Sequence, residues 1–568
     1  MRTHGRHTIY NASEDQVRIG SVFDGEGYSY DFVVVGSGFG GSVAALRLAE
    51  RGYRVLVLEA GRHFSPDDFP PSNWHLRRFL WAPKLGCHGI QRLTLLSDAL
   101  VLSGAGVGGG SLVWANTVFE PGPDAFAAGW PDDGWHDRLA PHYEVARRML
   151  GATPTPRTWP GDDHLRAFAD SLGRGETFKP TDVAVLFGDE PGKEVGDPFF
   201  DGIGPRRHTC TMCGGCMVGC WVGAKNTLDT NYLYLAQKLG AEIRASTEAH
   251  LIEADGAGGW LIHTRPAERG GANRGEIILA RGVVLAAGVL GTVDLLLRCR
   301  EAGTLPDLPA SLGHRVRTNS EVICGATARR KGTDFSQGIA IASSIHPAPD
   351  TTLEVVRYPA GSDFMGILAT LLTADGTHLT RPLRWLGSFA RHPIDGLRVK
   401  WPFGWAERTV LLLAMQTVDN AFRLERRRRW WHPFGPTLAS ARDAGVPPAP
   451  AFIAAANDAS RFIAGRIDGF PASALNEVLA AIPTTAHILG GACMASSPGE
   501  GVIDDRNRVF GHDNLWVVDG SAVPVNLGVN PSLTITAIAE HAMSLIPAKD
   551  PRQGMRPLPP RARGAIQT

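Results

Sequence analysis

Short apolar runs and helical patterns alternate near the start of the chain. Residues 28–35 form a β-branched run, and residues 36–41 contain four glycines. Residues 42–51 are Ala-rich with helical spacing, and residues 54–58 form a second apolar run. A strand, a glycine turn, a helix and a second strand in this order predict a β–α–β unit.

The glycines of this unit have the spacing of a dinucleotide-binding turn. Gly36 permits the tight turn, Gly38 lets the backbone approach a pyrophosphate, and Gly41 lets helix and strand pack closely. Glu59 ends the second strand, where it is placed to accept hydrogen bonds from an adenosine ribose. The pattern therefore predicts a bound dinucleotide, and it does not distinguish NAD from FAD.

The elements that follow continue the same half of the fold. Residues 101–111 form a second Gly-rich segment, which indicates that something large lies against the backbone. We expect a helix over 227–239, a strand at 242–245, a hairpin over 251–284, and a strand, glycine turn and helix over 283–297.

The middle of the chain has a different character. Between residues 326 and 481, strand-like stretches at 338–344, 352–358 and 409–417 are separated by segments that contain Trp, Arg and Pro. This pattern predicts a sheet-based substrate domain.

Composition narrows the class of protein. The 568 residues are 43% hydrophobic and 20% charged, enough for a large core in more than one domain. Lys plus Arg and Asp plus Glu both total 57, so no net charge favours nucleic acid as a partner.

The first ten residues lack the apolar core of a secretory signal, so we expect a cytoplasmic protein. The longest apolar runs are far shorter than the roughly 18 to 20 residues that span a bilayer. Peripheral membrane contact stays open. Residues 385–405 mix aromatic and basic residues and suit either a membrane-facing rim or an ordinary loop-rich domain surface, and we favour the latter.

Four of the eight cysteines lie within eleven residues. Cys210, Cys213, Cys216 and Cys220 have the spacing C-x2-C-x2-C-x3-C that bacterial ferredoxins use for iron–sulfur clusters. A zinc ion bound by the same cysteines is an alternative, and free thiols or disulfides are a third interpretation. Trp221 stands where ferredoxins have Pro.

The C-terminal block holds two residues suited to alcohol chemistry. His487 and Asn530 each lie on a Gly-rich turn. An imidazole and a carboxamide can together hydrogen-bond one hydroxyl group and accept its proton while a neighbouring cofactor accepts the hydride.

These motifs together resemble the glucose-methanol-choline (GMC) oxidoreductases. The matching segments are 36–41, 107–113, 286–292 and the order His-x-Leu-Gly-Gly, Asp-Gly-Ser and Gly-Val-Asn-Pro in the C-terminal block. That order looks most like the cholesterol oxidase branch of the family. The resemblance covers most of residues 28–546 and is weakest between about 360 and 480.

The resemblance implies FAD as the cofactor. By matching motif it implies that Gly36, Gly38, Gly41 and Glu59 hold the ADP half and that Gly108, Gly109 and Gly110 lie along the flavin. It implies that Asp519 and Gly520 meet the ribityl and pyrophosphate region and that Asn530 and Pro531 border the isoalloxazine ring. Asn116 is a further expected cofactor-binding residue. The chain departs from the branch at Trp114, where an Asn is typical.

The same resemblance implies a catalytic set of His487, Asn530 and Glu354. His487 fixes the hydroxyl, Asn530 orients it, and Glu354 occupies the position of the glutamate that moves a double bond in steroid oxidases. An alternative is that Glu354 merely pairs with Arg357. Glu321 is a further acid that we interpret as structural.

The expected fold is α/β (α+β overall), with a Rossmann-like FAD-binding domain and a discontinuous sheet-based substrate domain. We assign residues 28–130, 221–325 and 483–548 to the FAD-binding domain and 326–482 to the substrate domain. A Cys-rich insertion and cap takes residues 131–220, and a disordered tail takes 549–568.

The expected reaction is oxidation of a bulky apolar secondary alcohol, such as a 3-hydroxysteroid or terpenoid, by hydride transfer to flavin N5. The alternative enzyme is a flavin-dependent ketosteroid isomerase or reductase, and a non-enzymatic relay is the third hypothesis. Electrons leave to O2 or, through an iron–sulfur cluster, to a protein or quinone acceptor. Some glucose dehydrogenases of the family are similar in carrying such a cluster at this point of the chain.

Overall fold

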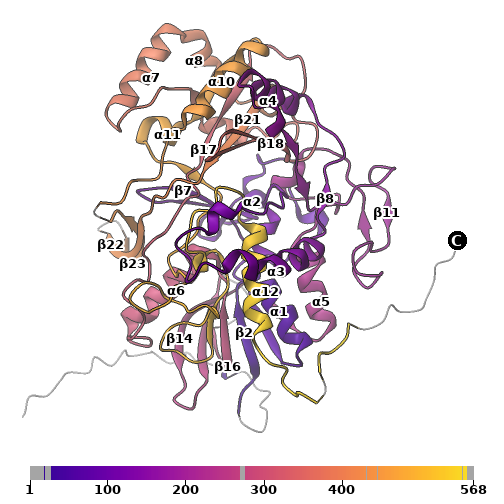
Figure 1. The fold of residues 1–568 in the computed structure, drawn as a ribbon, viewed down its shortest axis with the longest axis vertical. Coiled ribbons are helices and arrows are strands. Elements are labelled where there is room, and N and C mark those ends of the chain that lie inside the picture. Colours follow the sequence, from indigo (N-terminus) through magenta and orange to yellow (C-terminus); the bar gives the residue numbers. More distant parts are fainter. Residues whose placement is uncertain are drawn as a thin grey trace, which may run out of the picture.

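The computed structural model describes residues 18–19, 27–268, 275–429, 432–443, 445–552 and 554–558. Of the predicted tail, residues 553 and 559–568 lie outside this set. Figure 1 shows a lower half built around β2, β16, α1 and α12 and an upper half that carries α10, α7 and α8.

The lower half contains the predicted β–α–β unit. β2 (Tyr30–Val35), α1 (Phe39–Glu50) and β3 (Val55–Leu58) follow one another, and the two strands pair in parallel. Nearly all residues of both strands are buried, as expected for parallel strands covered on both faces. The prediction of a Rossmann-like unit is confirmed.

Segments far apart in sequence complete this sheet (Figure 1). Its order is β13-β3-β2-β16-β15-β14, where β16 (Glu276–Leu285) pairs in parallel with β2 and with β26 (Leu515–Val517). The remaining strands are β13 (Glu242–Arg244), β14 (Thr247–Ala254), β15 (Trp260–Pro266) and the short β1 (Arg18–Ile19). The sheet therefore brings the C-terminal block beside the first glycine turn.

Buried helices cover this sheet. α12 (Ser532–Ser544) packs against both α1 and α3 (Trp135–Leu150), and eleven of its thirteen residues are buried. Further helices are α5 (Tyr232–Lys238) and α6 (Gly288–Ala302). The helix expected over 227–239 begins only at Tyr232, because a short 3₁₀ turn, Leu228–Thr230, precedes it and the Asn231 side chain caps it.

The upper half is built on a second sheet. Its order is β20-β24-β17-β21-β19-β18-β9, and its pairings are antiparallel. The strands are β9 (Lys179–Pro180), β17 (Val322–Ala328), β18 (Ile341–Ala348), β19 (Thr351–Val356), β20 (Ala369–Leu371), β21 (Thr409–Gln416) and β24 (Gly469–Ala474).

Alternation along these strands separates two apolar faces. On β21, Val410, Leu412 and Ala414 pack under α4 (Pro160–Ser171) and α10 (Ala454–Arg466), whereas Leu411, Leu413 and Met415 join a different cluster on the opposite face. The second face is directed toward the first sheet and forms part of the site described below.

Residues 385–405 are not the loop-rich surface that we favoured. They contain the end of α7 (Thr380–Arg391), α8 (Pro393–Val399) and the start of α9 (Trp405–Arg408). Trp385 and Phe389 are four residues apart and share the inner face of α7, a helical period that the Pro and Gly residues of the segment conceal.

Smaller strand pairings lie outside the two main sheets. β7 (Leu100–Gly104) pairs with β6 (Gln91–Leu95) and with β25 (Thr484–Thr485), which precedes His487. β22 (Arg423–Arg429) and β23 (His432–Ala441) form a separate hairpin. No helix among the described residues is long and apolar enough to cross a bilayer.

A buried ion pair fastens α4 to the second sheet. Arg357, just after β19, donates to the Asp162 carboxylate, which also accepts from Ser343 Oγ (2.6 Å) and from the backbone N–H of Trp159 (2.8 Å). Both charged residues are almost fully buried. Such a pair is costly to leave half-made, because the remaining charge stays desolvated.

We expect Asp162→Ala to lower the free energy of unfolding by about 3–5 kcal/mol, because it leaves the Arg357 guanidinium buried without its carboxylate. Urea titration of tryptophan fluorescence measures this. Asp458→Ala removes an exposed pair with Arg461 and serves as the control, with an expected loss below about 1 kcal/mol. Equal losses in the two variants would contradict this account of the upper half.

Candidate active site

A single elongated cavity of about 690 Å³ runs between the two halves. At one end it is lined by the first glycine turn and by the end of β3, and at the other by residues that precede β17, follow β25 and precede α12. The predicted site residues that line it are Gly36, Gly38, Glu59, Gly109, Gly110, His487, Asp519, Gly520, Asn530 and Pro531.

The first glycine turn has the geometry of a phosphate cradle. Gly36 has φ +100°, and a Cβ there would lie 2.2 Å from the Ala286 carbonyl oxygen. A Cβ on Gly41 would lie 2.0 Å from the Gly36 oxygen. Gly38 borders the cavity with nothing within 4 Å of its Cβ position, so the N-terminus of α1 presents its backbone to open space.

Glu59 organises this end of the cavity. One oxygen accepts from the N–H (3.1 Å) and hydroxyl (2.7 Å) of Ser37, and the other accepts from the N–H of Gly61 (2.8 Å). The carboxylate therefore holds the turn and also borders the cavity, where a ribose would meet it.

The second Gly-rich segment lies directly on the first. A Cβ on Gly109 would lie 2.7 Å from Gly38 Cα, and the Gly108 N–H donates to Ser37 Oγ (3.1 Å). Trp114 also lines the cavity, at the position where the chain departs from the cholesterol oxidase branch. Asn116 is fully buried at φ +70°, and its amide atoms have no hydrogen-bond partner among the described residues.

Asp519 closes the cavity between these turns and α12. Its carboxylate accepts from Thr292 Oγ1 (2.5 Å) and from the N–H of Ser521 (2.8 Å). Burial raises the pKa of Asp519 above its usual range. Open glycine backbone, an acid at the end of β3 and a polar loop before α12 together fit FAD, the dinucleotide that the sequence motifs imply.

At the far end of the cavity the structure brings His487, Asn530 and Glu354 together. The Nδ2 atom of Asn530 lies 3.4 Å from His487 Nε2 and donates to Glu354 Oε2 at the same distance. Asn530 Oδ1 has no partner among the described residues. The cluster thus presents an imidazole nitrogen and a free amide oxygen at the cavity wall.

Glu321, which the sequence analysis treated as structural, is a direct neighbour of this cluster. It accepts from Thr485 Oγ1 (2.6 Å) and from the N–H of His487 (3.2 Å), and its Oε1 lies 3.2 Å from His487 Nδ1. Burial disfavours the charged imidazole, but the carboxylates of Glu321 and Glu354 outweigh burial and raise the pKa of His487. Glu321 belongs to no recognisable sequence motif. It lies two positions before Ile323, however, so strand alternation places both side chains on the face that lines the cavity.

Glu354 is fully buried, and burial raises its pKa to about 7. Its Oε1 has no partner among the described residues. The alternative that Glu354 pairs with Arg357 is wrong, because Arg357 is engaged by Asp162 and strand alternation directs the two residues to opposite faces of the sheet. Glu354 contacts the cluster through Asn530.

Around this cluster the cavity is apolar. Its wall here comes from the inner face of the second sheet and from the Cys-rich segment, and sequence patterns did not single these residues out. They are Met217, Ile323, Ile341, Val356, Leu411 and Leu413. A bulky hydrocarbon suits such a chamber.

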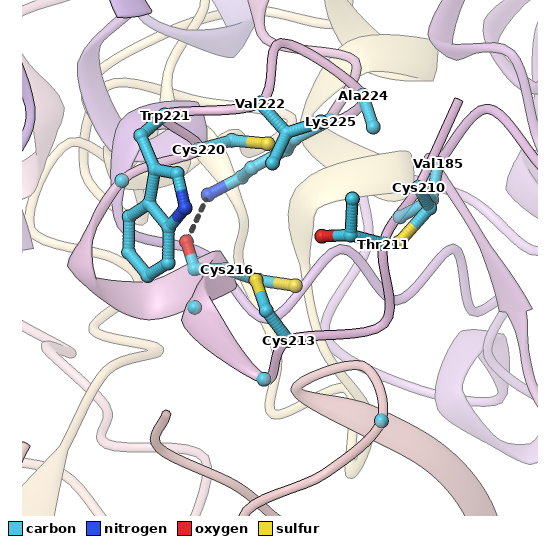
Figure 2. Close-up of a pocket in the computed structure, with 14 residues that line it drawn as sticks. Val185, Cys210, Thr211, Cys213, Cys216, Cys220, Trp221, Val222, Ala224 and Lys225 are labelled. Carbon is cyan, nitrogen blue, oxygen red and sulfur yellow. Dashed lines mark hydrogen bonds between the residues drawn. The ribbon is translucent and has the colours of Figure 1, made fainter. Parts of the chain in front are cut away.

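The four clustered cysteines line a separate small pocket (Figure 2). Burial raises the pKa of Cys216 to about 11 and also raises those of Cys210 and Cys213. Within the described ranges, no three His, Cys, Asp or Glu side chains are arranged to hold a metal ion. The predicted metal site is therefore not supported by the described residues.

Two family models match the chain. Residues 34–67 match an NAD(P)-binding Rossmann-like domain, and residues 415–539 match GMC oxidoreductase. A cholesterol oxidase of Acinetobacter baumannii is 42% identical over 92% of this chain and 95% of its own length. A cholesterol oxidase of Mycobacterium tuberculosis (strain H37Rv) is 45% identical over 92% of this chain and 91% of its own length.

Solved structures share the fold at lower identity. Pyridoxine 4-oxidase from Mesorbium loti gives a TM-score of 0.58 at 18% identity, covering 90% of this chain and 98% of that chain. A fungal aryl-alcohol oxidase gives 0.53 at 15% identity over 91% and 98%. From its relatives, its family models and the cavity that fits FAD, the chain belongs to the GMC oxidoreductase family and is an FAD-dependent oxidoreductase.

Proposed function

We propose that the protein oxidises a bulky apolar secondary alcohol, with a 3-hydroxysteroid as the leading substrate, to the ketone. The observation that carries this proposal is the pairing of His487 Nε2 with the Asn530 amide at the wall of an apolar chamber. Two relatives that are named cholesterol oxidases support the steroid class.

In this proposal each residue of the cluster has a different role toward the substrate hydroxyl. Glu321 faces Nδ1 of His487, which favours the tautomer with its proton on Nδ1 and leaves Nε2 unprotonated, so that Nε2 can accept the hydroxyl proton. The raised pKa of His487 strengthens that acceptance. Asn530 orients the oxygen through its amide. Bound FAD supplies the hydride acceptor.

His487→Ala should slow anaerobic flavin reduction by a 3β-hydroxysteroid by about 10²–10⁴-fold, because the proton acceptor is lost. Loss of flavin absorbance after mixing measures the rate. His75→Ala, at an exposed position outside the cavity, is the matched control and should reduce at the wild-type rate. Wild-type protein that shows no absorbance change with any secondary alcohol of a steroid and terpenoid panel would contradict the proposed function.

A second enzymatic candidate is a flavin-dependent ketosteroid isomerase or reductase. The buried Glu354 carboxyl supports it, because a group with a pKa near neutrality exchanges protons readily. An isomerase would leave flavin absorbance unchanged while the double bond moves. We propose that Glu354 adds double-bond migration to alcohol oxidation and does not replace it.

Glu354→Gln should abolish double-bond migration in an enone-forming assay and leave alcohol oxidation largely intact. In the wild type, migration should accelerate as pH rises through about 7, because burial raises the pKa of Glu354 to about 7 and only the deprotonated carboxylate accepts a proton. Ultraviolet absorbance of the conjugated ketone reports the product. A variant that keeps both the migration and its pH profile would remove Glu354 from this role.

We propose O2 as the electron acceptor, as the names of the oxidase relatives suggest. The Cys pocket supports a second candidate, an iron–sulfur cluster that passes electrons to a protein or quinone. Its support is the ferredoxin-like spacing, the shared pocket, and the Met212 N–H that donates to Cys210 Sγ (3.3 Å). The thiolate ligands of a cluster bind several different iron atoms, so they need not converge on one point as the ligands of a single metal ion do.

Anaerobically purified protein tests this candidate through its iron and acid-labile sulfide content. If a cluster is present, Cys213→Ser and Cys216→Ser should each lose most of the iron, whereas Cys87→Ser, which lies outside the pocket, should keep it. Wild-type protein free of iron and sulfide would eliminate the cluster and leave O2 as the proposed acceptor.

A further inference from the structure

Apolar side chains gather on the outer surface of α7, α8 and the segment that follows them. Fifteen large hydrophobic residues are exposed among the described residues, and seven of these lie within 25 positions, each 55–69% exposed. Scattered exposed residues are ordinary, whereas a concentration of this kind marks an interaction surface. We name it the α7–α8 face: Leu379, Leu383, Leu386, Ile394, Leu397, Trp401 and Phe403.

The α7–α8 face is distinct from the residues that attach these helices to the protein. On the inner side of α7, Trp385 Nε1 donates to Thr370 Oγ1 (2.7 Å), and Phe389 packs in a cluster with Val399 and Phe470. Arg381 is buried and donates to the Ala451 carbonyl (2.8 Å). The inner side is thus fully used in packing, and the leucines at 379, 383 and 386 point outward with helical spacing.

Basic residues border the α7–α8 face. Residues 375–404 contain four basic side chains outside the buried Arg381, namely Arg384, Arg391, Arg398 and Lys400, and two acidic ones, Asp375 and Asp395. Asp395 is already engaged by Arg329 (2.8 Å) and Arg398 (3.2 Å). Arg384 and Arg391 are exposed and form no ion pair with any described residue. An apolar surface with a positive border complements the anionic surface of a phospholipid bilayer.

The aromatic residues of the face suit the same environment. Trp401 and Phe403 pack edge to face (5.4 Å between centroids), and Phe403 stacks on Trp74 (5.9 Å). The rings are therefore held outward by the body of the protein. Trp and Phe with interspersed Arg are typical of segments that rest in the interface of a membrane.

We propose that the α7–α8 face binds the surface of an anionic phospholipid membrane as a peripheral anchor. A second copy of this chain is a poorer occupant, since a symmetric dimer would oppose the two positive borders. The face lies at the end of the molecule opposite β2 and β16 and is attached to the second sheet through β20 (Figure 1). Binding through it would hold the substrate half against the bilayer.

Vesicle sedimentation with the full, FAD-loaded chain tests this proposal. Sterol-free vesicles of phosphatidylcholine alone and of phosphatidylcholine with phosphatidylglycerol are the probes, so the outcome is independent of the proposed reaction. We expect binding to the anionic vesicles that weakens with salt, and little binding to the neutral ones. The double variant Leu383→Ser/Leu386→Ser should reduce the partition coefficient by about tenfold or more, because it removes apolar area from the contact.

The controls separate the face from general surface stickiness. Leu172→Ser/Leu545→Ser alters two other exposed leucines, 46% and 45% exposed, and should bind like the wild type. Arg384→Gln/Arg391→Gln should weaken binding only to the anionic vesicles. Equal sedimentation of the wild type and the Leu383/Leu386 variant would overturn the proposal. So would light scattering that shows a dimer that this variant dissociates, with no vesicle binding by the wild type.

Discussion

Backbone segments from distant parts of the chain meet at the first glycine turn at distances that leave no room for a side chain. A Cβ on Gly36 would clash with Ala286, one on Gly40 would lie 2.0 Å from the Val518 oxygen, and one on Gly109 would clash with Gly38. These contacts fix where β16, β26 and the second Gly-rich segment lie relative to α1. Because Asp519 follows Val518 directly, the same contacts place the C-terminal block along the cavity.

The cluster of His487, Asn530 and Glu354 depends on carboxylates that are buried away from water. Glu321 satisfies its oxygens with Thr485, Ala486 and His487 and so shapes the turn that carries the imidazole. Glu354 accepts only the long hydrogen bond from Asn530 and has a raised pKa, whereas the two carboxylates together raise the pKa of His487. The same buried environment thus raises the pKa of both His487 and Glu354, which is the property that the proposed proton transfers require.

The two halves contribute different things to the site. The first, mixed sheet positions backbone and polar turns, and the antiparallel second sheet contributes an apolar wall through every second residue of its strands. Residues such as Ile323 and Leu413 therefore set the shape of the apolar chamber, whereas turns at the junction carry the cluster to which we assign the chemistry. The Cys-rich segment joins both, since Met217 lines the cavity and the Lys225 ammonium donates to the carbonyls of Cys216 and Trp114.

The sequence by itself determined the β–α–β unit, its glycine turn and the pairing of His487 with Asn530, because these depend on local backbone requirements and on motifs that keep their spacing. It did not determine the roles of Glu321 and Arg357, the helices at residues 380–399 or the arrangement of the cysteines. Those depend on which side chains from distant parts of the chain become buried together. Only the tertiary structure decides that, because the pKa and the hydrogen-bond partners of a buried carboxylate depend on neighbours that are far from it in the sequence.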